Sequence, residues 1–190
     1  MEKRLVRDEF EKVIHQVTYF KLPHNMKRKF LKLMENSTLK IMIISKLEHE
    51  LSLLKDGPED QLQRERILRQ LGPLYSDFEN KALGCYLQLL ELIKEKATPY
   101  ELGTCYKKIG EAYEIENQYQ EALATFQKSL EILENNGGTE KFHEEILDIY
   151  ASIFTIYGDL EDNAKAAEYQ QKIMELHDKG EYANEDEEVE

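Results

Sequence analysis

The chain has 190 residues and a formal net charge of −13, from 25 basic and 38 acidic side chains. This length suits one ordinary globular unit, and the apolar content is sufficient for a core, so the composition excludes wholesale disorder. No apolar run approaches the roughly 18 residues that a membrane-spanning helix needs, and the N-terminus lacks the apolar stretch of a secretory signal. Two cysteines cannot form a disulfide framework. We therefore expect a cytoplasmic protein, with the nucleus as the alternative compartment.

The negative charge is unevenly distributed along the chain. Residues 1–75 carry 15 basic and 11 acidic side chains, whereas residues 76–190 carry 10 and 27. This acidic balance argues against nucleic-acid binding through the average charge, and the short basic stretch at Lys27–Lys32 is interpreted as the solvated face of a packed helix. Residues 179–190 are polar and acidic, which predicts a disordered tail.

Hydrophobic spacing of i, i+3, i+4 and i+7 recurs along nearly the whole chain, and no long stretch alternates with the period of a strand. The fold is therefore predicted to be all-α, with short connections between antiparallel neighbours. Asp56-Gly57-Pro58 is a break, and residues 1–56 before it are either a diverged helical pair or a separate cap. Helices are expected at about 2–20, 24–36, 38–55, 59–76, 79–96, 98–116, 119–136, 139–159 and 163–178.

A pattern of small and large residues repeats between residues 59 and 178. Its clearest copy is Tyr106-x2-Ile109-Gly110-x2-Tyr113, followed by Ala122-x3-Phe126. Small residues at Gly110 and Ala122 would let two helices cross closely, with large side chains filling the space beside the crossing. The other copies are Leu68-x2-Leu71-Gly72-x2-Tyr75 with Ala82-x3-Tyr86, and, more loosely, Tyr150-x2-Ile153-Phe154-x2-Tyr157 with Ala166.

Two departures from this pattern predict local distortion. Pro73 lies inside the first helix of the first copy, so that helix should kink or restart there. Gly110 and Phe154 are 44 residues apart, where about 34 are expected for repeats of this kind. The third copy must therefore have longer helices, or a longer connection around residues 135–138.

The pattern resembles the tetratricopeptide repeat over about residues 61–178. The resemblance implies an α-solenoid of about three antiparallel helix pairs, in which the first helix of each pair lines a concave groove. It therefore implies a groove that binds a peptide segment of a partner protein. The implied groove residues are Arg66, Arg69 and Gln70 in the first copy, Lys107, Lys108 and Glu111 in the second, and Asp148, Ser152 and Thr155 in the third.

The resemblance also bears on the ligand's charge. Arg69 and Lys107 would lie at equivalent places one repeat apart, and such a positive stripe would select an acidic partner segment. The alternative, that these are ordinary solvated charges, stays open. Lys107 matches the lysine of the dicarboxylate clamp that holds chaperone tails, but Glu111 stands where that clamp has asparagine. We therefore do not expect a clamp of that kind.

Catalytic signatures are not found in the sequence. It contains no His-Glu-x2-His motif, no phosphate-binding glycine loop and no nucleophile elbow, and Cys85 and Cys105 are interpreted as buried thiols. The prediction is a non-catalytic adaptor with no metal, no cofactor, no nucleic acid and no membrane partner. The alternative is a bacterial regulator resembling the peptide-sensing receptors, including the Rap type. The oligomeric state is not predicted.

Overall fold

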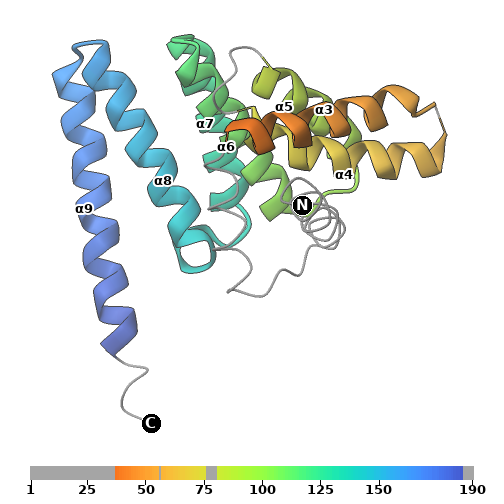
Figure 1. The fold of residues 1–190 in the computed structure, drawn as a ribbon. Helices are drawn as coiled ribbons and strands as arrows, with labels where there is room; N and C mark the ends of the chain where they lie inside the picture. The colour runs from red at the N-terminus through yellow and green to blue at the C-terminus, as the bar shows by residue number, and fades with distance from the viewer. Residues whose placement is uncertain (1–36, 56, 76–80, 186–190) are drawn as a thin grey trace, which may run out of the picture. The chain divides into compact units, whose positions relative to one another are not determined.

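The computed structural model describes residues 37–55, 57–75 and 81–185, and every regular element in these ranges is a helix (Figure 1). The all-α prediction is confirmed, and the expected helices from residue 38 onward are present with starts and ends within three residues, except for the end of the last one. The predicted helices 2–20 and 24–36 lie outside the described residues. The helices are α3 Ser37–Leu53, α4 Pro58–Leu74, α5 Lys81–Ile93, α6 Pro99–Ile115, α7 Tyr119–Glu134, α8 Gly138–Asp159 and α9 Asn163–Glu185.

The last helix is longer than expected. α9 continues to Glu185, whereas the predicted helix ended at Asp178 and the predicted tail began at the next residue. The added residues are mostly good or neutral helix formers, and Gly180 costs only about 1 kcal/mol relative to alanine. Such a segment can extend a helix that is already nucleated by packing. Residues 186–190 of the predicted tail lie outside the described residues.

The chain divides into two compact units between Leu74 and Tyr75. The first unit contains α3 and α4, and the second contains α5 to α9. The predicted boundary lay earlier, at the break near Gly57. The first helix of the first predicted copy therefore belongs to the same unit as α3, and its second helix, α5, belongs to the other.

The first unit is built from the packing of α3 against α4. Ile44 and Leu47 of α3 are buried, as are Leu68 and Leu71 of α4. Ile41 of the same helix is 56% exposed. Apolar residues occupy several successive positions in this helix, so periodicity alone did not identify the buried side.

Pro73 does not restart α4. The helix includes Pro73 and ends one residue later, at Leu74, so the predicted restart is wrong. A proline in the last turn removes only one backbone hydrogen bond near an end that frays in any case. The preceding residue, Gly72, has no Cβ to clash with the proline ring, which lets it keep a helical conformation.

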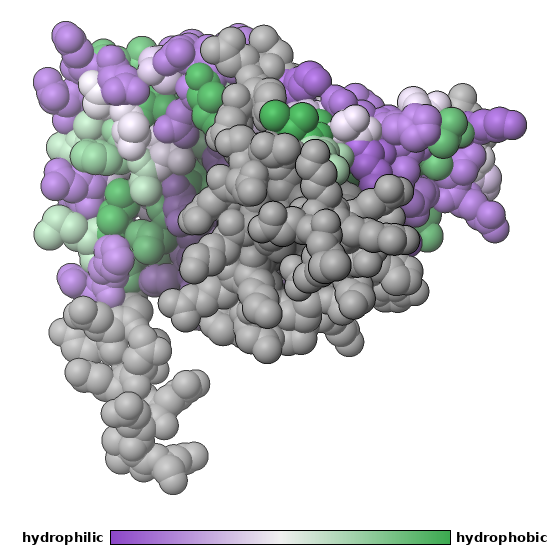
Figure 2. All heavy atoms as spheres, viewed as in Figure 1, coloured by the Kyte–Doolittle hydropathy of each residue, from purple (hydrophilic) through white to green (hydrophobic). Residues whose placement is uncertain are grey.

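In the second unit each helix packs against the next, and α6 also contacts α8. Apolar side chains from α7, α8 and α9 form one continuous buried cluster. Figure 2 shows that hydrophilic residues cover most of the visible described surface, with hydrophobic residues scattered among them. The members of the buried cluster are Ala122, Phe126, Leu130, Leu133, Phe142, Ile146, Ile149, Ile153, Ile156 and Leu176.

Two glycines of α6 allow α7 to approach closely. A Cβ added at Gly110 would lie 2.7 Å from two ring carbons of Phe126, which is fully buried. A Cβ at Gly103 would lie 2.6 Å from a methyl carbon of Leu133. Ser129 donates a hydrogen bond of 2.7 Å to the Gly103 carbonyl at the same crossing. The close crossing predicted at Gly110 is confirmed, and Gly103, seven residues earlier on the same helix face, adds a second contact point that the repeat pattern did not indicate.

The third copy accommodates its long spacing in α8. This helix begins directly after the turn at residues 135–137 and has a non-helical residue, Phe142, inside it (φ −127°, ψ 41°). α8 thus consists of two helical segments joined at a kink, a first turn of residues 138–141 and a main body of residues 143–159 that is as long as α6, so the extra residues lie in the turn before the main body. Phe154, which replaces the glycine of the pattern, is 38% exposed. Tyr169 of α9 packs against Tyr150 and Tyr157 of α8 instead, with ring centroids 5.7 and 5.9 Å apart.

The turns after α6 and α8 share one geometry. Asn117 and Glu161 both adopt the left-handed conformation, with φ of 56° and 58°. In each turn the following amide donates a 2.9 Å bond to the carbonyl of an upstream tyrosine, Tyr113 or Tyr157, as in the Schellman motif. Asparagine tolerates this conformation, whereas glutamate in it is strained.

We expect Glu161→Asn to raise the free energy of unfolding by about 1 kcal/mol, because it relieves this strain. The reciprocal change, Asn117→Glu, should lower it by at least as much, since it also removes the 3.0 Å contact between the Asn117 amide oxygen and the Tyr119 hydroxyl. Urea denaturation followed by circular dichroism measures both variants. Equal stability of the two variants would contradict the strain assigned to Glu161.

Candidate functional site

The predicted groove residues lie on three helices in two units. Those of α4 belong to the first unit, and those of α6 and α8 belong to the second. Because α6 contacts α8, six of the nine predicted residues lie on two adjoining helices, whose polar side chains we treat as one surface. We call this surface the α6–α8 face. It comprises Tyr100, Lys107, Lys108, Glu111 and Glu114 of α6, and Glu145, Asp148, Ser152, Thr155 and Asp159 of α8.

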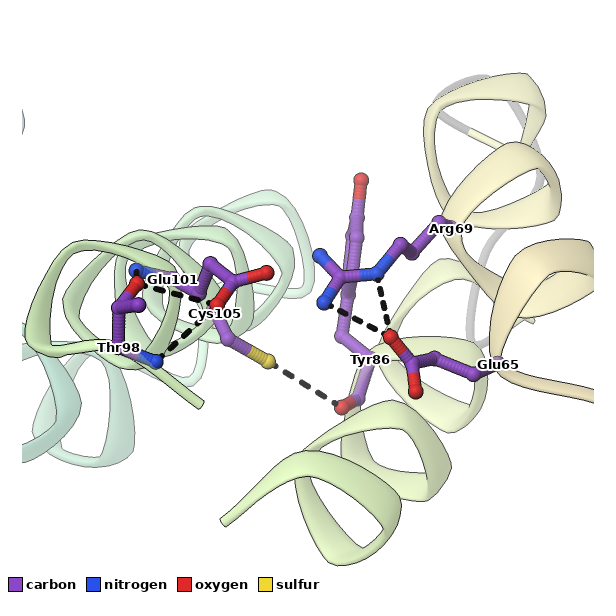
Figure 3. A network of polar contacts seen from close by, with 6 residues as sticks. All are labelled: Glu65, Arg69, Tyr86, Thr98, Glu101 and Cys105. Atoms are coloured by element: carbon purple, nitrogen blue, oxygen red, sulfur yellow. Dashed lines mark hydrogen bonds and ion pairs between the residues drawn. The ribbon is translucent and has the colours of Figure 1, made fainter. Parts of the chain in front are cut away.

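On α4 the predicted residues contact their own helix. The Arg69 guanidinium lies 3.0 Å from a carboxylate oxygen of Glu65, one turn earlier, and its Nε donates to the same atom at 3.1 Å (Figure 3). The Gln70 amide donates to the Arg66 carbonyl at 3.1 Å. The Arg69 side chain is therefore already opposite an acidic group in its own helix.

Lys107 and Asp148 form an ion pair between α6 and α8. The Lys107 ammonium lies 2.7 Å from a carboxylate oxygen of Asp148. The lysine side chain is only 9% exposed, whereas the aspartate side chain is 66% exposed. Lys107 and Asp148, which were predicted separately, thus lie in contact. The lysine reaches across the contact between the two helices and neutralises the Asp148 carboxylate at the edge of that contact.

The other predicted residues of the face also have partners within the chain. The Lys108 ammonium lies 2.5 Å from a carboxylate oxygen of Glu111. The exposed Thr155 hydroxyl donates to the Ala151 carbonyl of its own helix at 3.0 Å. The predicted cations of this face are therefore both engaged in ion pairs with carboxylates.

Four further polar residues belong to the face and were not predicted. Tyr100 forms a hydrogen bond with Glu145 that raises the pKa of the Tyr100 hydroxyl. Its ring, 46% exposed, stacks on Phe142 at a centroid distance of 5.9 Å. The sequence did contain a signal for part of this set, because Tyr100, Lys107 and Glu114 are spaced at i, i+7 and i+14 and so lie in one stripe of α6.

The remaining unpredicted residues are acidic and lie near the ends of α6 and α8. Burial raises the pKa of the Glu114 carboxyl above its ordinary value, the nearby Glu111 and Asp159 carboxylates raise it further, and a hydrogen bond from Ser152 lowers it. Asp159 accepts a 2.9 Å hydrogen bond from the Tyr119 hydroxyl, which raises the pKa of that tyrosine. Since Glu114 and Asp159 occupy the last turns of their helices, they add to the negative ends of two helix dipoles.

The two cysteines support the structure. Both are buried thiols, and the Cys105 thiol lies 3.8 Å from the Tyr86 carbonyl of α5 (Figure 3). Burial raises the pKa of the Tyr86 hydroxyl, and Glu111 contributes to the rise. Near them a capping box between Thr98 and Glu101 begins α6. The interpretation of the cysteines as buried thiols is confirmed.

The described residues contain neither a candidate metal site nor a candidate membrane-spanning helix. Within residues 37–55, 57–75 and 81–185, no three histidine, cysteine or acidic side chains are arranged to hold a metal ion. Among the helices of that same part of the chain, none combines the length and the apolar character needed to cross a membrane.

Comparison with known proteins identifies the repeat. Residues 63–135 match the family model described as Tetratricopeptide repeat. The match covers the first and second copies of the pattern and ends before α8, in agreement with the departure of the third copy at Phe154. A comparison with curated proteins gives no match. Residues 63–135 are therefore similar to tetratricopeptide repeats, and they lie within an all-α succession of helices that agrees with such a repeat.

Proposed function

We propose that this protein is a non-catalytic interaction module that binds a peptide segment of a partner protein on the α6–α8 face. Tetratricopeptide repeats generally serve as protein–protein interaction scaffolds. The observation that carries the proposal is the position of this face. The face is formed by α6 and α8, the first helices of two successive helix pairs. Polar side chains link these two helices, and apolar groups do not fill their outer surface.

The predicted acidic ligand is not part of this proposal. That prediction depended on Arg69 and Lys107 as two cations available to a ligand. Each lies within 3.0 Å of a carboxylate of this chain, so a carboxylate ligand would have to replace an existing ion pair. The acidic ligand expected from the sequence stays a prediction.

A second candidate is a regulator that senses a short free peptide, as in the Rap-type receptors that the sequence resembles in part. The observation that favours it is the length of α9, which has 23 residues. The two candidates share the α6–α8 face and differ in the ligand, which is a segment of a folded partner in one and a free peptide in the other.

The test is affinity purification of the full chain and two variants, followed by mass spectrometry. Thr155→Arg places a long side chain on the α6–α8 face, where Thr155 is exposed and bonds only within its own helix. Gln170→Arg adds the same charge at an exposed position of α9 and is the matched control. We expect Thr155→Arg to lose proteins that the unmodified chain and Gln170→Arg retain. Identical protein sets for both variants, or no enriched protein at all, would contradict binding at this face.

A further inference from the structure

Three carboxylates of the α6–α8 face have no cation opposite them. Among the described residues, no lysine, arginine or histidine forms an ion pair with Glu114, Glu145 or Asp159, although the two lysines of the face pair with Asp148 and Glu111. Their partners are uncharged hydroxyl groups: Ser152 for Glu114, Tyr100 for Glu145 and Tyr119 for Asp159. A hydroxyl satisfies one lone pair of a carboxylate but does not neutralise its charge.

The face as a whole is therefore negative. Its two lysines stand against five carboxylates, and the negative ends of the α6 and α8 dipoles lie in the same region as Glu114 and Asp159. Half-burial of Glu114 lowers the local dielectric constant, so an opposite charge placed there would interact more strongly than in water. The arrangement attracts cations and disfavours anions.

Exposed apolar side chains border these carboxylates. Tyr100 lies beside Glu145 at the start of α6, and Ile115, 57% exposed, follows Glu114 directly at its end. A segment that covers both ends of α6 would bury apolar surface as well as meet the carboxylates. A ligand that complements both the negative charge and the apolar side chains of Tyr100 and Ile115 is amphipathic and not a simple cation.

We propose that the α6–α8 face binds a partner-protein segment in which lysine or arginine residues alternate with apolar ones. This proposal rests on the proposed function and specifies the chemistry of its ligand. Basic side chains of the segment pair with Glu114, Glu145 and Asp159, and its apolar side chains contact Tyr100 and Ile115. The ligand has the opposite charge to the one predicted from Arg69 and Lys107, because both of those cations already have carboxylate partners.

Fluorescence anisotropy with two labelled peptides tests the proposal on the full chain. One is a short peptide of alternating lysine and leucine, and the other has glutamate in every lysine position. The triple variant Glu114→Gln, Glu145→Gln and Asp159→Asn removes the three unpaired charges. The matched control, Glu95→Gln, Glu131→Gln and Asp178→Asn, removes the same number and kind of charges from exposed positions outside the face.

We expect the lysine peptide to bind the unmodified chain and the control about equally, and the triple variant about tenfold more weakly or worse. The glutamate peptide should bind none of them. Equal affinity of the lysine peptide for the triple variant and the control would overturn the proposal, since binding would then reflect only the overall negative charge. So would the absence of lysine-peptide binding, even if Thr155→Arg loses partner proteins, a result that would leave the proposed function intact.

The single variant Glu114→Gln separates loss of binding from loss of folding. The raised pKa of Glu114 means that its ionised form is disfavoured in the folded chain, so Glu114→Gln should not lower the melting temperature at neutral pH. Circular dichroism of each variant verifies this before binding is measured. Glu114→Gln alone should then weaken lysine-peptide binding while the chain remains folded, and a single variant that binds as tightly as Glu131→Gln would contradict the role of Glu114.

Discussion

Replacing Lys107 by glutamate is expected to lower the free energy of unfolding by about 3 kcal/mol. The lysine side chain is 9% exposed, so a carboxylate in its place would be largely removed from water. It would also lie beside Asp148, where the ammonium now makes a 2.7 Å ion pair, and one turn before Glu111 on the same helix. Both desolvation and repulsion therefore act against the ionised glutamate.

Lys107→Met is the matched variant, and we expect its stability to remain within about 1 kcal/mol of the unmodified chain. Methionine keeps most of the buried volume of the lysine stem. The charge left behind belongs to Asp148, which is 66% exposed and stays hydrated without its partner. Guanidinium denaturation of the two variants measures the difference. Equal losses for both would show that the ion pair itself, and not the burial of position 107, determines the stability.

This result also affects how binding at the face is tested. A charge reversal at Lys107 would weaken binding by unfolding α6 and α8 as readily as by changing a ligand contact. Lys107→Met separates the two effects, because it removes the charge while keeping the packing. If the face binds a basic segment, this variant should bind at least as tightly as the unmodified chain, since it exposes the Asp148 carboxylate.

The helices and their repeat could be predicted from the sequence because they depend on local order. Gly110, Ala122 and Phe126 have fixed separations along two helices, and those separations determine which side chains meet at the crossing. Pro73 and the end of α9 were predicted less well. Each depends on a small free-energy difference that residue type alone does not determine. At Pro73 it is the cost of one lost backbone hydrogen bond, and at the end of α9 it is the modest helix propensity of the added residues.

For the candidate site, the sequence predicted individual residues but not which of them contact one another. Repeat register placed Lys107 and Asp148 on first helices, but it did not pair them, because the pairing depends on how α8 lies against α6. The position of α8 depends on the kink at the non-helical residue Phe142, and no spacing rule predicts that kink. Glu145 was missed for the same reason, whereas the stripe of Tyr100, Lys107 and Glu114 could be found in the sequence; the net negative charge of the face was missed with these residues. The charge of a repeat surface thus follows from contacts between helices, not from residue counts within them.

Gly110→Ala is expected to lower the free energy of unfolding by about 2 kcal/mol. Alanine gains up to about 1 kcal/mol in helix propensity, and this gain would dominate if the site were open. It is not open, because the new Cβ would meet three ring carbons of Phe126 at 2.7, 2.7 and 3.0 Å. Phe126 is fully buried, so the ring cannot move aside without displacing its neighbours in the core.

Gly84→Ala in α5 is the control, since a Cβ at Gly84 has no atom within 4 Å. There the propensity gain is unopposed, and stability should rise by about 0.5 to 1 kcal/mol. A second comparison isolates the contact itself: in the presence of Phe126→Leu, whose side chain is shorter than the ring, Gly110→Ala should cost less than it does alone. Thermal and urea denaturation of the four variants gives this coupling. If Gly110→Ala costs the same in both backgrounds, or stabilises the chain as Gly84→Ala does, then close packing against Phe126 is not what requires glycine at this crossing.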